Sequence, residues 1–338
     1  MSTTVFVSGA TGFIAQNIIK ELLSKDYKVI GSVRSEKKGQ DLEKLINSSN
    51  FKYTIVPEIG TPGAFDETSK ENPEIKVVLH TASPVFFTSD DVKKEILDPA
   101  VEGTKNVLVA VQKYGTNVER FVYTSSTVCV LPFGTGQSPK EARVFTEEDF
   151  NPITEEQGVA NAFAAYSAGK TFAEKEVWKF METEKPKFKV SFVLPSFVFG
   201  PQAYKVDDNT KLNFTSGIIK SLLQMKPDDE IPENLGYFID VRDVAKAHLV
   251  AFEKDEAINQ RLLLTNERFT NELIAHIISS NFPQLNIPKG DVVKSEEQLQ
   301  NDCWTTDTSK TEAILGFKYI GLDDSIIDSV ESLLDSSE

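Results

Sequence analysis

Short apolar, β-branched runs alternate with amphipathic stretches up to about residue 200, and this alternation constrains the fold more than any other feature. The amphipathic stretches predict helices at Ile14–Ser24 and Asp91–Tyr114. Strand–helix–strand units of this kind close as right-handed crossovers and give a parallel sheet. The strand runs are almost continuously apolar, as expected when helices cover both faces of the sheet. The predicted fold class is therefore α/β, a Rossmann-type doubly wound parallel sheet with strands at Thr4–Ser8, Lys28–Val33, Lys52–Val56, Lys76–Thr81, Arg120–Thr124 and Lys189–Leu194.

The pattern loosens after Phe199. Loops are predicted at Gly200-Pro201, at 226–229 and at 281–290, with helices between them at Val241–Glu253, Asn271–Ser280 and Leu322–Leu334. This part is expected to form a smaller C-terminal lobe folded onto the sheet. The segment 131–158 is rich in Gly, Pro and charge, and it predicts a long loop that could cover an active site.

Composition excludes several classes of protein. Thirty-six Lys and Arg face 51 Asp and Glu, a net charge of −15 that argues against nucleic acid or an anionic membrane as the main partner. No apolar run approaches the ~20 residues of a membrane-spanning helix, and no signal peptide is evident. Two cysteines, Cys129 and Cys303, and three scattered histidines predict neither disulfides nor a metal site. A reducing, cytoplasmic location is expected.

A glycine-rich turn follows the first predicted strand and opens the first predicted helix. Its residues are Gly9, Ala10, Thr11, Gly12, Phe13, Ile14 and Ala15. Glycines let the backbone approach a pyrophosphate, and the helix N-terminus supplies N–H groups and the positive end of its dipole. The pattern predicts dinucleotide binding rather than a turn without a ligand. Residues 1–199 are then mainly the NADP-binding domain and 200–338 mainly the substrate-binding lobe, with some elements exchanged between them.

The end of the second strand indicates which dinucleotide binds. An NAD site usually has an acidic residue here on the ribose 2′-hydroxyl, whereas a 2′-phosphate needs a cation. Arg34 ends this strand, Lys37 and Lys38 follow, and the first carboxylate is Glu36. NADPH is therefore preferred over NADH. The alternative is a solvated basic start of a helix.

Two further features predict catalytic residues. Tyr166 and Lys170 are four residues apart, so on a helix the phenol and the ammonium share one face, where the lysine charge would lower the pKa of the tyrosine. Ser125 and Ser126 end the fifth predicted strand, at the crevice formed by the carboxyl ends of the strands. Such a Tyr–Lys pair alone is often a surface neighbour pair, and serines often end strands, but the order along the chain favours a reaction centre.

Taken together, these segments make the chain similar to the extended short-chain dehydrogenase/reductase superfamily over essentially its full length. Within it, the chain resembles the dihydroflavonol-4-reductase-like family and most closely that family's yeast group of methylglyoxal and 3-methylbutanal reductases. The resemblance is carried by the glycine turn, Tyr166 with Lys170, and the segments 80–84, 124–126, 197–201 and 240–248.

The resemblance implies roles for individual residues. The second serine of the Thr-Ser-Ser run would be catalytic, which maps to Ser126, together with Tyr166 and Lys170. The 2′-phosphate would meet Arg34 and Lys38. Adenine contacts would fall on Glu58 and Ile59, and nicotinamide and phosphate contacts on Thr81, Pro195, Val198 and Ser216. Glu58 departs from the family, where this acid is often Asp.

Other candidate residues carry less weight. Phe86 and Phe87 could line a substrate pocket or be ordinary core aromatics. Thr127 and Leu131 stand where relatives carry larger or aromatic pocket residues, so the substrate range cannot be transferred. His248 is predicted to be a packing or hydrogen-bonding histidine, and Cys129 a small buried apolar residue.

These expectations combine into an NADPH-dependent reductase of aldehydes and ketones, with a small-molecule carbonyl substrate and a monomeric or homodimeric state. Two other readings remain at this point. One is a nucleotide-sugar epimerase or dehydratase on the same fold, and the other is a non-catalytic protein that senses NADPH. The sequence leaves the physiological substrate and the stereochemistry of the alcohol open.

Overall fold

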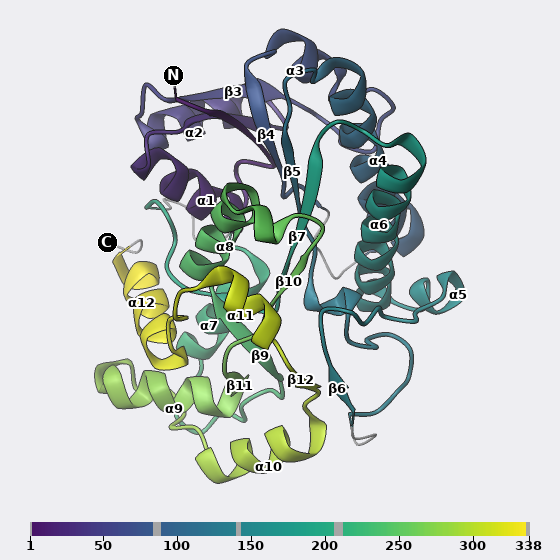
Figure 1. Ribbon diagram of the computed structural model, residues 1–338. Coiled ribbons are helices and arrows are strands. Elements are labelled where there is room, and N and C mark those ends of the chain that lie inside the picture. Colours follow the sequence, from purple (N-terminus) through teal and green to yellow (C-terminus); the bar gives the residue numbers. More distant parts are fainter. Residues whose placement is uncertain (1, 84–88, 140–142, 206–211, 336–338) are drawn as a thin grey trace.

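A seven-stranded parallel sheet forms the centre of the molecule (Figure 1). The computed structural model describes residues 2–83, 89–139, 143–205 and 212–335. The sheet has the order β10-β7-β5-β4-β1-β2-β3. All six predicted strands are present, with bounds shifted by at most one residue, and the predicted α/β class is confirmed. The strands are β1 Thr4–Ser8, β2 Lys28–Val33, β3 Phe51–Ile55, β4 Ile75–His80, β5 Arg120–Thr124, β7 Lys189–Pro195 and β10 Arg261–Leu264.

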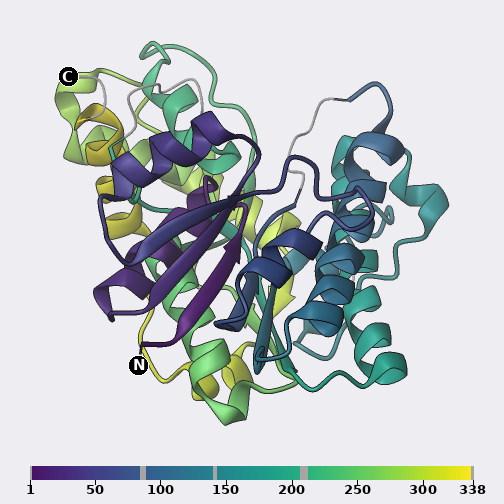
Figure 2. The same ribbon diagram turned by 90° about the horizontal axis from the view of Figure 1, so that it is seen from above.

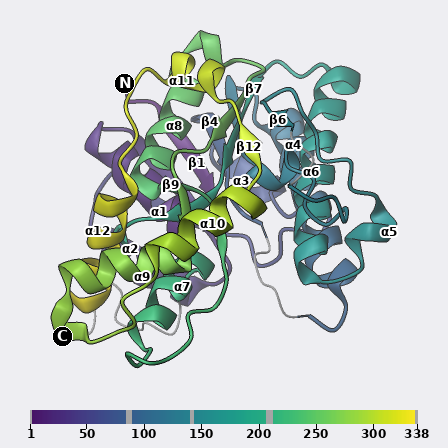
Figure 3. The same cartoon turned by 90° about the horizontal axis from the view of Figure 1, so that it is seen from below.

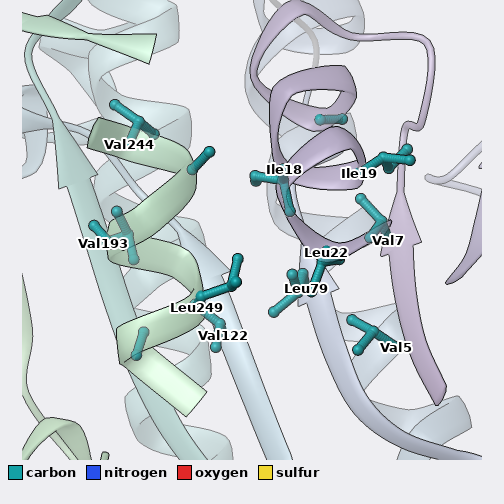
Figure 4. Packing of buried hydrophobic residues seen from close by; sticks show 14 of the residues in the cluster. Val5, Val7, Ile18, Ile19, Leu22, Leu79, Val122, Val193, Val244 and Leu249 are labelled. Atoms are coloured by element: carbon teal, nitrogen blue, oxygen red, sulfur yellow. The ribbon is translucent and has the colours of Figure 1, made fainter. Parts of the chain in front are cut away.

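Helices cover both faces of this sheet (Figures 1 and 2). Because successive side chains of a strand point to opposite faces, Val5 and Val7 of β1 enter one core and Phe6 enters the other. The core of the first face packs against α1 and α8, as Figure 4 shows. The helices on this face are α1 Phe13–Ser24, α2 Glu36–Ile46, α8 Val241–Glu253 and α11 Ser309–Leu315. Those on the second face are α3 Asp66–Glu71, α4 Asp98–Tyr114 and α6 Ala162–Glu184.

A second, three-stranded sheet lies below the first, surrounded by α7, α9, α10 and α12 (Figure 3). Its strands are β8 Phe197–Phe199, β9 Leu235–Asp240 and β11 Arg268–Thr270. The helices are α7 Phe214–Leu223, α9 Asn271–Asn281, α10 Val292–Asp302 and α12 Leu322–Asp335. The three helices predicted beyond residue 199 are confirmed as α8, α9 and α12. None of these described helices is both long and apolar enough to span a bilayer.

The helix α12 fixes the segment that follows β8. Ser329 Oγ accepts a hydrogen bond from Gly200 N at 2.9 Å, and Ser332 Oγ accepts one from Gln202 N at 3.1 Å. Asp328 of the same helix pairs with Arg242 at 2.6 Å. A helix near the carboxyl end of the chain therefore holds a loop that begins 130 residues earlier.

Two predicted segments differ from the structure. The stretch Asp91–Tyr114 is not one regular helix, because a π-helical turn, η1 Lys93–Leu97, precedes α4. Pro99 has no N–H to donate and its ring crowds the preceding turn, which accounts for the wider turn there. The predicted loop 131–158 contains β6 Val144–Phe145, paired with β12 Thr305–Thr306, and α5 Glu155–Gly158, begun by a capping box of Thr154 and Gln157.

Candidate active site

The carboxyl ends of the parallel strands open into a cleft of about 1570 Å³. Its walls come from the loops after β1, β2, β3, β4, β5 and β7, from the first turns of α6, and from the small sheet. The main-sheet part of this lining is the crevice where open α/β sheets bind their ligands. Nearly all the residues singled out in the sequence meet here.

The glycine turn presents its backbone to the cleft. Gly9 has a φ of +69°, and a Cβ at this position would lie 3.1 Å from Ala82 Cα. Gly12 is the N-cap of α1 and contributes no side-chain cap, so the first N–H groups of the helix are left for a ligand. Ser8 Oγ accepts hydrogen bonds from Thr81 N and Ala82 N, both at 3.0 Å, and thereby ties the ends of β1 and β4 together. The cradle fits a pyrophosphate.

The cations after β2 also line the cleft. Arg34 and Lys38 are both exposed and both belong to its wall, whereas Lys37 does not. The first carboxylate after the strand, Glu36, is used elsewhere, since it accepts hydrogen bonds from Tyr53 Oη at 2.7 Å and Gln40 Nε2 at 3.0 Å. Two positive charges from this turn therefore line the cleft just after β2, while the carboxylate of Glu36 is bonded to Tyr53 and Gln40.

Most of the other predicted cofactor contacts line the cleft as well. They include Glu58 and Ile59 after β3, Thr81 after β4, and Pro195 and Val198 around the end of β7. Two predicted contacts lie outside the lining. Ala10 is fully buried against Gly31, and the hydroxyl of Ser216 accepts a hydrogen bond from Gln202 Nε2 at 3.0 Å, while its neighbours Phe214 and Thr215 line the cleft.

Ser126, Tyr166 and Lys170 come together at the end of β5. Asn161 caps α6 with its side chain, which sets the helix so that Tyr166 and Lys170 face the strand one turn apart. Tyr166 and Ser126 share a side-chain hydrogen bond. Lys170 Nζ donates to the carbonyl of Thr124 at 2.8 Å. All three residues line the cleft.

Burial controls the titration of this centre. Desolvation raises the pKa of Tyr166 to about 12, against the effect of its hydrogen bond with Ser126. The expected lowering of the tyrosine pKa by Lys170 is thus outweighed here, and the phenol carries its proton at neutral pH. Burial also lowers the pKa of Lys170 to about 8, while the nearby carboxylate of Glu174 acts in the opposite direction.

The two neighbouring serines have different partners. Ser125 Oγ donates its hydrogen to Glu174 and lies 3.1 Å from Cys129 Sγ, so its hydroxyl is bonded to buried groups of the core. Glu174 Oε1 in turn accepts from Arg261 Nε at 2.6 Å, and both of these charged side chains are buried. Neither Glu174 nor Arg261 was predicted from the sequence. A glutamate four residues after Lys170, on the same helix face, was the only available signal.

The remaining candidates fall into three groups. Thr127 and Leu131 line the cleft, together with Phe133 and Phe163. His248 is buried outside the lining and bonds to Thr124 Oγ1 at 2.7 Å, and Cys129 is fully buried, so the expectations for both are confirmed. Phe86 and Phe87 lie outside the described residues. Within the part of the chain that the structure describes, no cluster of His, Cys, Asp and Glu could hold a metal ion.

Comparisons with known proteins agree with this geometry. The profile of the NAD dependent epimerase/dehydratase family matches residues 5–263. The chain is 42% identical to the NADPH-dependent methylglyoxal reductase GRE2 of Saccharomyces cerevisiae, covering 98% of both chains. The crystal structure of Gre2 from Candida albicans in complex with NADPH superposes with a TM-score of 0.94 at 44% identity and covers 99% of both chains. The yeast methylglyoxal/isovaleraldehyde reductase Gre2 complexed with NADPH gives a TM-score of 0.94 at 41% identity, again over 99% of both chains.

Proposed function

This chain belongs to the NAD dependent epimerase/dehydratase family, and we propose that within it the protein is an NADPH-dependent carbonyl reductase that converts aldehydes and ketones to alcohols. The observation that carries the proposal is the position of Ser126, Tyr166 and Lys170 in the same cleft as Arg34 and Lys38. In this proposal, a reaction centre for carbonyl groups and a binding site for a 2′-phosphate would share one crevice.

The residues present fit NADPH. The Gly9–Gly12 turn and the N-terminus of α1 would hold the pyrophosphate, Arg34 and Lys38 the 2′-phosphate, and Glu58 and Ile59 the adenine side. Thr81, Pro195 and Val198 would contact the nicotinamide half. When bound, NADPH supplies the hydride that becomes the new C–H bond of the alcohol.

The protein's own residues handle the carbonyl oxygen. Tyr166 is protonated at neutral pH, so it can donate its proton to the oxygen as negative charge develops there. Ser126 hydrogen-bonds the same oxygen and fixes its place beside the phenol. Lys170 would bind the nicotinamide ribose and, through its charge, stabilise the phenolate left after proton transfer. Interactions that strengthen only as this charge appears raise kcat.

Further proposals concern organisation and setting. Residues 1–199 would be mainly the cofactor domain and 200–338 mainly the substrate lobe, with β10 and α8 as exchanged elements, since both pack on the main sheet. We place the protein in the cytoplasm, because Cys129 and Cys303 are both free thiols, as a reducing compartment favours. A monomer or homodimer is the proposed oligomeric state. Methylglyoxal, 3-methylbutanal, diketones and aryl ketones are the substrates to test.

The decisive variant is Tyr166→Phe. It removes the proton donor and keeps the ring, so kcat for NADPH-dependent reduction of methylglyoxal is expected to fall by ~10²-fold or more. Absorbance of NADPH follows turnover, and calorimetry checks that the Kd for NADPH changes by less than about threefold. Retention of more than about a tenth of the wild-type kcat would contradict the assigned role. A purified wild type that keeps tightly bound NAD and oxidises no NADPH would favour the epimerase reading instead.

A further inference from the structure

A buried ion pair lies directly behind the reaction centre. Glu174 is on α6, one helical turn after Lys170, and its side chain is fully buried. Its Oε1 accepts a hydrogen bond from Arg261 Nε at 2.6 Å, and its Oε2 accepts one from Ser125 Oγ. Neither Glu174 nor Arg261 belongs to the cleft lining, so the pair acts on a bound molecule only through its neighbours.

The guanidinium of Arg261 is also bonded to the backbone. It donates to the carbonyls of Glu147 at 2.7 Å and Cys129 at 3.3 Å, and its Cζ lies 3.9 Å from the centre of the Phe150 ring. Burying an ion pair costs desolvation energy, and well-packed apolar side chains in its place are often equally stable or more stable. Stability alone therefore does not account for a carboxylate at Glu174.

Lys170 is the charged neighbour on which this carboxylate acts. Lys170 is buried, and its Nζ donates to the carbonyl of Thr124 at 2.8 Å and lies 5.4 Å from the centre of the Tyr123 ring. Both of these partners are uncharged, and within the described part of the chain Lys170 forms no direct ion pair. On an α-helix, residues i and i+4 share a face, which brings the side chain of Glu174 toward that of Lys170.

The other titratable groups around Lys170 are neutral near pH 8. They are His80 of β4, Tyr123 of β5, Cys129 of the 3₁₀ turn Thr127–Cys129, Tyr166 of α6 and His248 of α8. Burial lowers the pKa of the two histidines to about 3 and about 4. Burial raises the pKa of Cys129 and of Tyr166 to about 12, and it raises that of Tyr123 well above its ordinary value.

Two further elements pack on α6 next to Lys170 and present apolar side chains there. They are η1 and α4, which contribute Leu97 and Ala100. Glu174 is therefore the group that places negative charge near Lys170, and Arg261 of β10 is its counter-charge.

We propose that Glu174 is a positioning residue of the reduction, whose carboxylate holds Lys170 in its charged form beside Tyr166. This inference rests on the proposed function, in which the ammonium of Lys170 binds the nicotinamide ribose and stabilises the phenolate. Burial favours the neutral amine, and the pKa of Lys170 is about 8 even with the carboxylate in place. The carboxylate therefore sets the upper end of the pH range in which the protein works.

The test follows kcat/KM for NADPH, with methylglyoxal as the substrate, and Kd for NADPH by calorimetry, both between about pH 6 and about pH 9.5. In the wild type, kcat/KM is expected to fall above about pH 8. Glu174→Gln keeps the size of the side chain and removes its charge. It is expected to move this fall down by about one pH unit, because an opposite charge is lost, and to move the rise of Kd with pH in the same way.

Three further variants separate charge from structural support. Glu174→Gln leaves Arg261 buried without a counter-charge, which costs stability, so the double variant Glu174→Gln/Arg261→Met removes both charges and is expected to show the same downward shift. Glu174→Asp keeps the charge and is expected to keep the wild-type pH limit. Arg261→Met alone leaves the carboxylate in place and is expected not to lower that limit. A purely structural pair would instead lower kcat/KM at every pH in both single charge-removing variants and leave the pH limit where it is.

Glu272→Gln is the matched control. Glu272 is a buried carboxylate paired with Lys294 at 2.7 Å outside the cleft lining, and its replacement is expected to leave the pH limit unchanged. The wild-type pH limit in the folded double variant would overturn the role of Glu174. A folded wild type that binds NADPH and reduces no carbonyl compound would overturn the proposed function instead, while the pH dependence of its Kd would still report the effect of Glu174.

Discussion

At the scale of the residue, the adjacent hydroxyls of Ser125 and Ser126 have different roles: the first stabilises the core, and the second faces the substrate cleft. Ser125 donates to the buried carboxylate of Glu174, which also accepts from Arg261. Ser126 faces the cleft and bonds to Tyr166. The change in direction comes from the chain itself, because β5 ends at Thr124, just before the two serines, and Ser126 is the N-cap of the 3₁₀ turn Thr127–Cys129 that follows them.

Alanine at each serine is therefore expected to affect a different measurement. Ser126→Ala removes a hydrogen bond to the reacting oxygen and is expected to lower kcat by ~10²-fold with little change in the unfolding midpoint. Ser125→Ala leaves Glu174 with one donor fewer in the core and is expected to cost about 1–3 kcal/mol of unfolding free energy while kcat stays within about threefold. Urea unfolding and steady-state kinetics on both variants check this. Equal losses of kcat would contradict the assignment of Ser126.

The catalytic residues and their supports differ in how far the sequence predicts them. Tyr166 and Lys170 belong to a local helical spacing, and Ser126 ends a recognisable strand, so all three can be found by reading along the chain. The ion pair of Glu174 with Arg261 joins residues 87 positions apart. Only the pairing of β7 with β10 brings Arg261 to α6, and no local pattern encodes that approach.

At the scale of the element, the junction of β2 and α2 sets the preference for the cofactor. Ser35 caps α2, so the chain turns sharply and presents Arg34 and Lys38 to the same cleft. Glu36 is held on the outside by Tyr53. Because the capped helix begins directly after the strand, Arg34 and Lys38 line the cleft while Glu36 lies outside it.

Removing the cation at this junction is expected to penalise NADPH alone. Arg34→Ala is expected to raise KM for NADPH by roughly 10–150-fold, because charge-assisted hydrogen bonds contribute ~1.5–3 kcal/mol, and to leave KM for NADH within about threefold. Lys37→Ala is the matched control, since Lys37 is a neighbouring cation outside the cleft lining. If Arg34→Ala raised both KM values equally, Arg34 would not be reading the 2′-phosphate.

Elements of the main sheet were predicted far better than those of the lobe. Six strands with continuous apolar runs are each recognisable alone, because burial on both faces leaves a strong signal. The strands β8 and β11 have only three residues each, and β12 has two. Such short segments show no periodicity, and they form strands only because the small sheet and the loop 143–151 pack against them.

At the scale of the whole molecule, two buried neutral histidines make the free energy of unfolding depend on pH. Burial, together with the charge of Lys170, lowers the pKa of His80 to about 3, and burial lowers that of His248 to about 4, from an ordinary value of 6.5. Below about pH 6.5, these two histidines bind protons in the unfolded chain, whereas in the folded protein they stay neutral until the pH approaches 4 for His248 and 3 for His80. The stabilising contribution is therefore complete above about pH 6.5 and is lost as the pH falls toward 4.

The free energy of unfolding is expected to drop by about 2 kcal/mol for each buried histidine between pH 7 and pH 5, measured by urea unfolding. His248→Gln removes one of the two titrating groups and is expected to flatten this dependence. His276→Gln, at an exposed position of α9, serves as control and is expected to keep the wild-type slope. If the unfolding free energy of His248→Gln changed with pH as steeply as that of the wild type, His248 would not contribute to the pH dependence.

During synthesis, the loop that begins at Gly200 can form its hydrogen bonds with α12 only after α12 has been translated. Ser329 and Ser332 of α12 hold that loop, and some 130 residues must be translated before they exist. At about 5–20 residues per second, this takes roughly 6–26 s. All strands of the main sheet except β10 are complete when Gly200 is made, and the edge of β7 that β10 covers stays unpaired until residue 264 has been translated. Synthesis of this chain thus passes through a long-lived partial sheet, the stage at which a nascent protein depends most on chaperones.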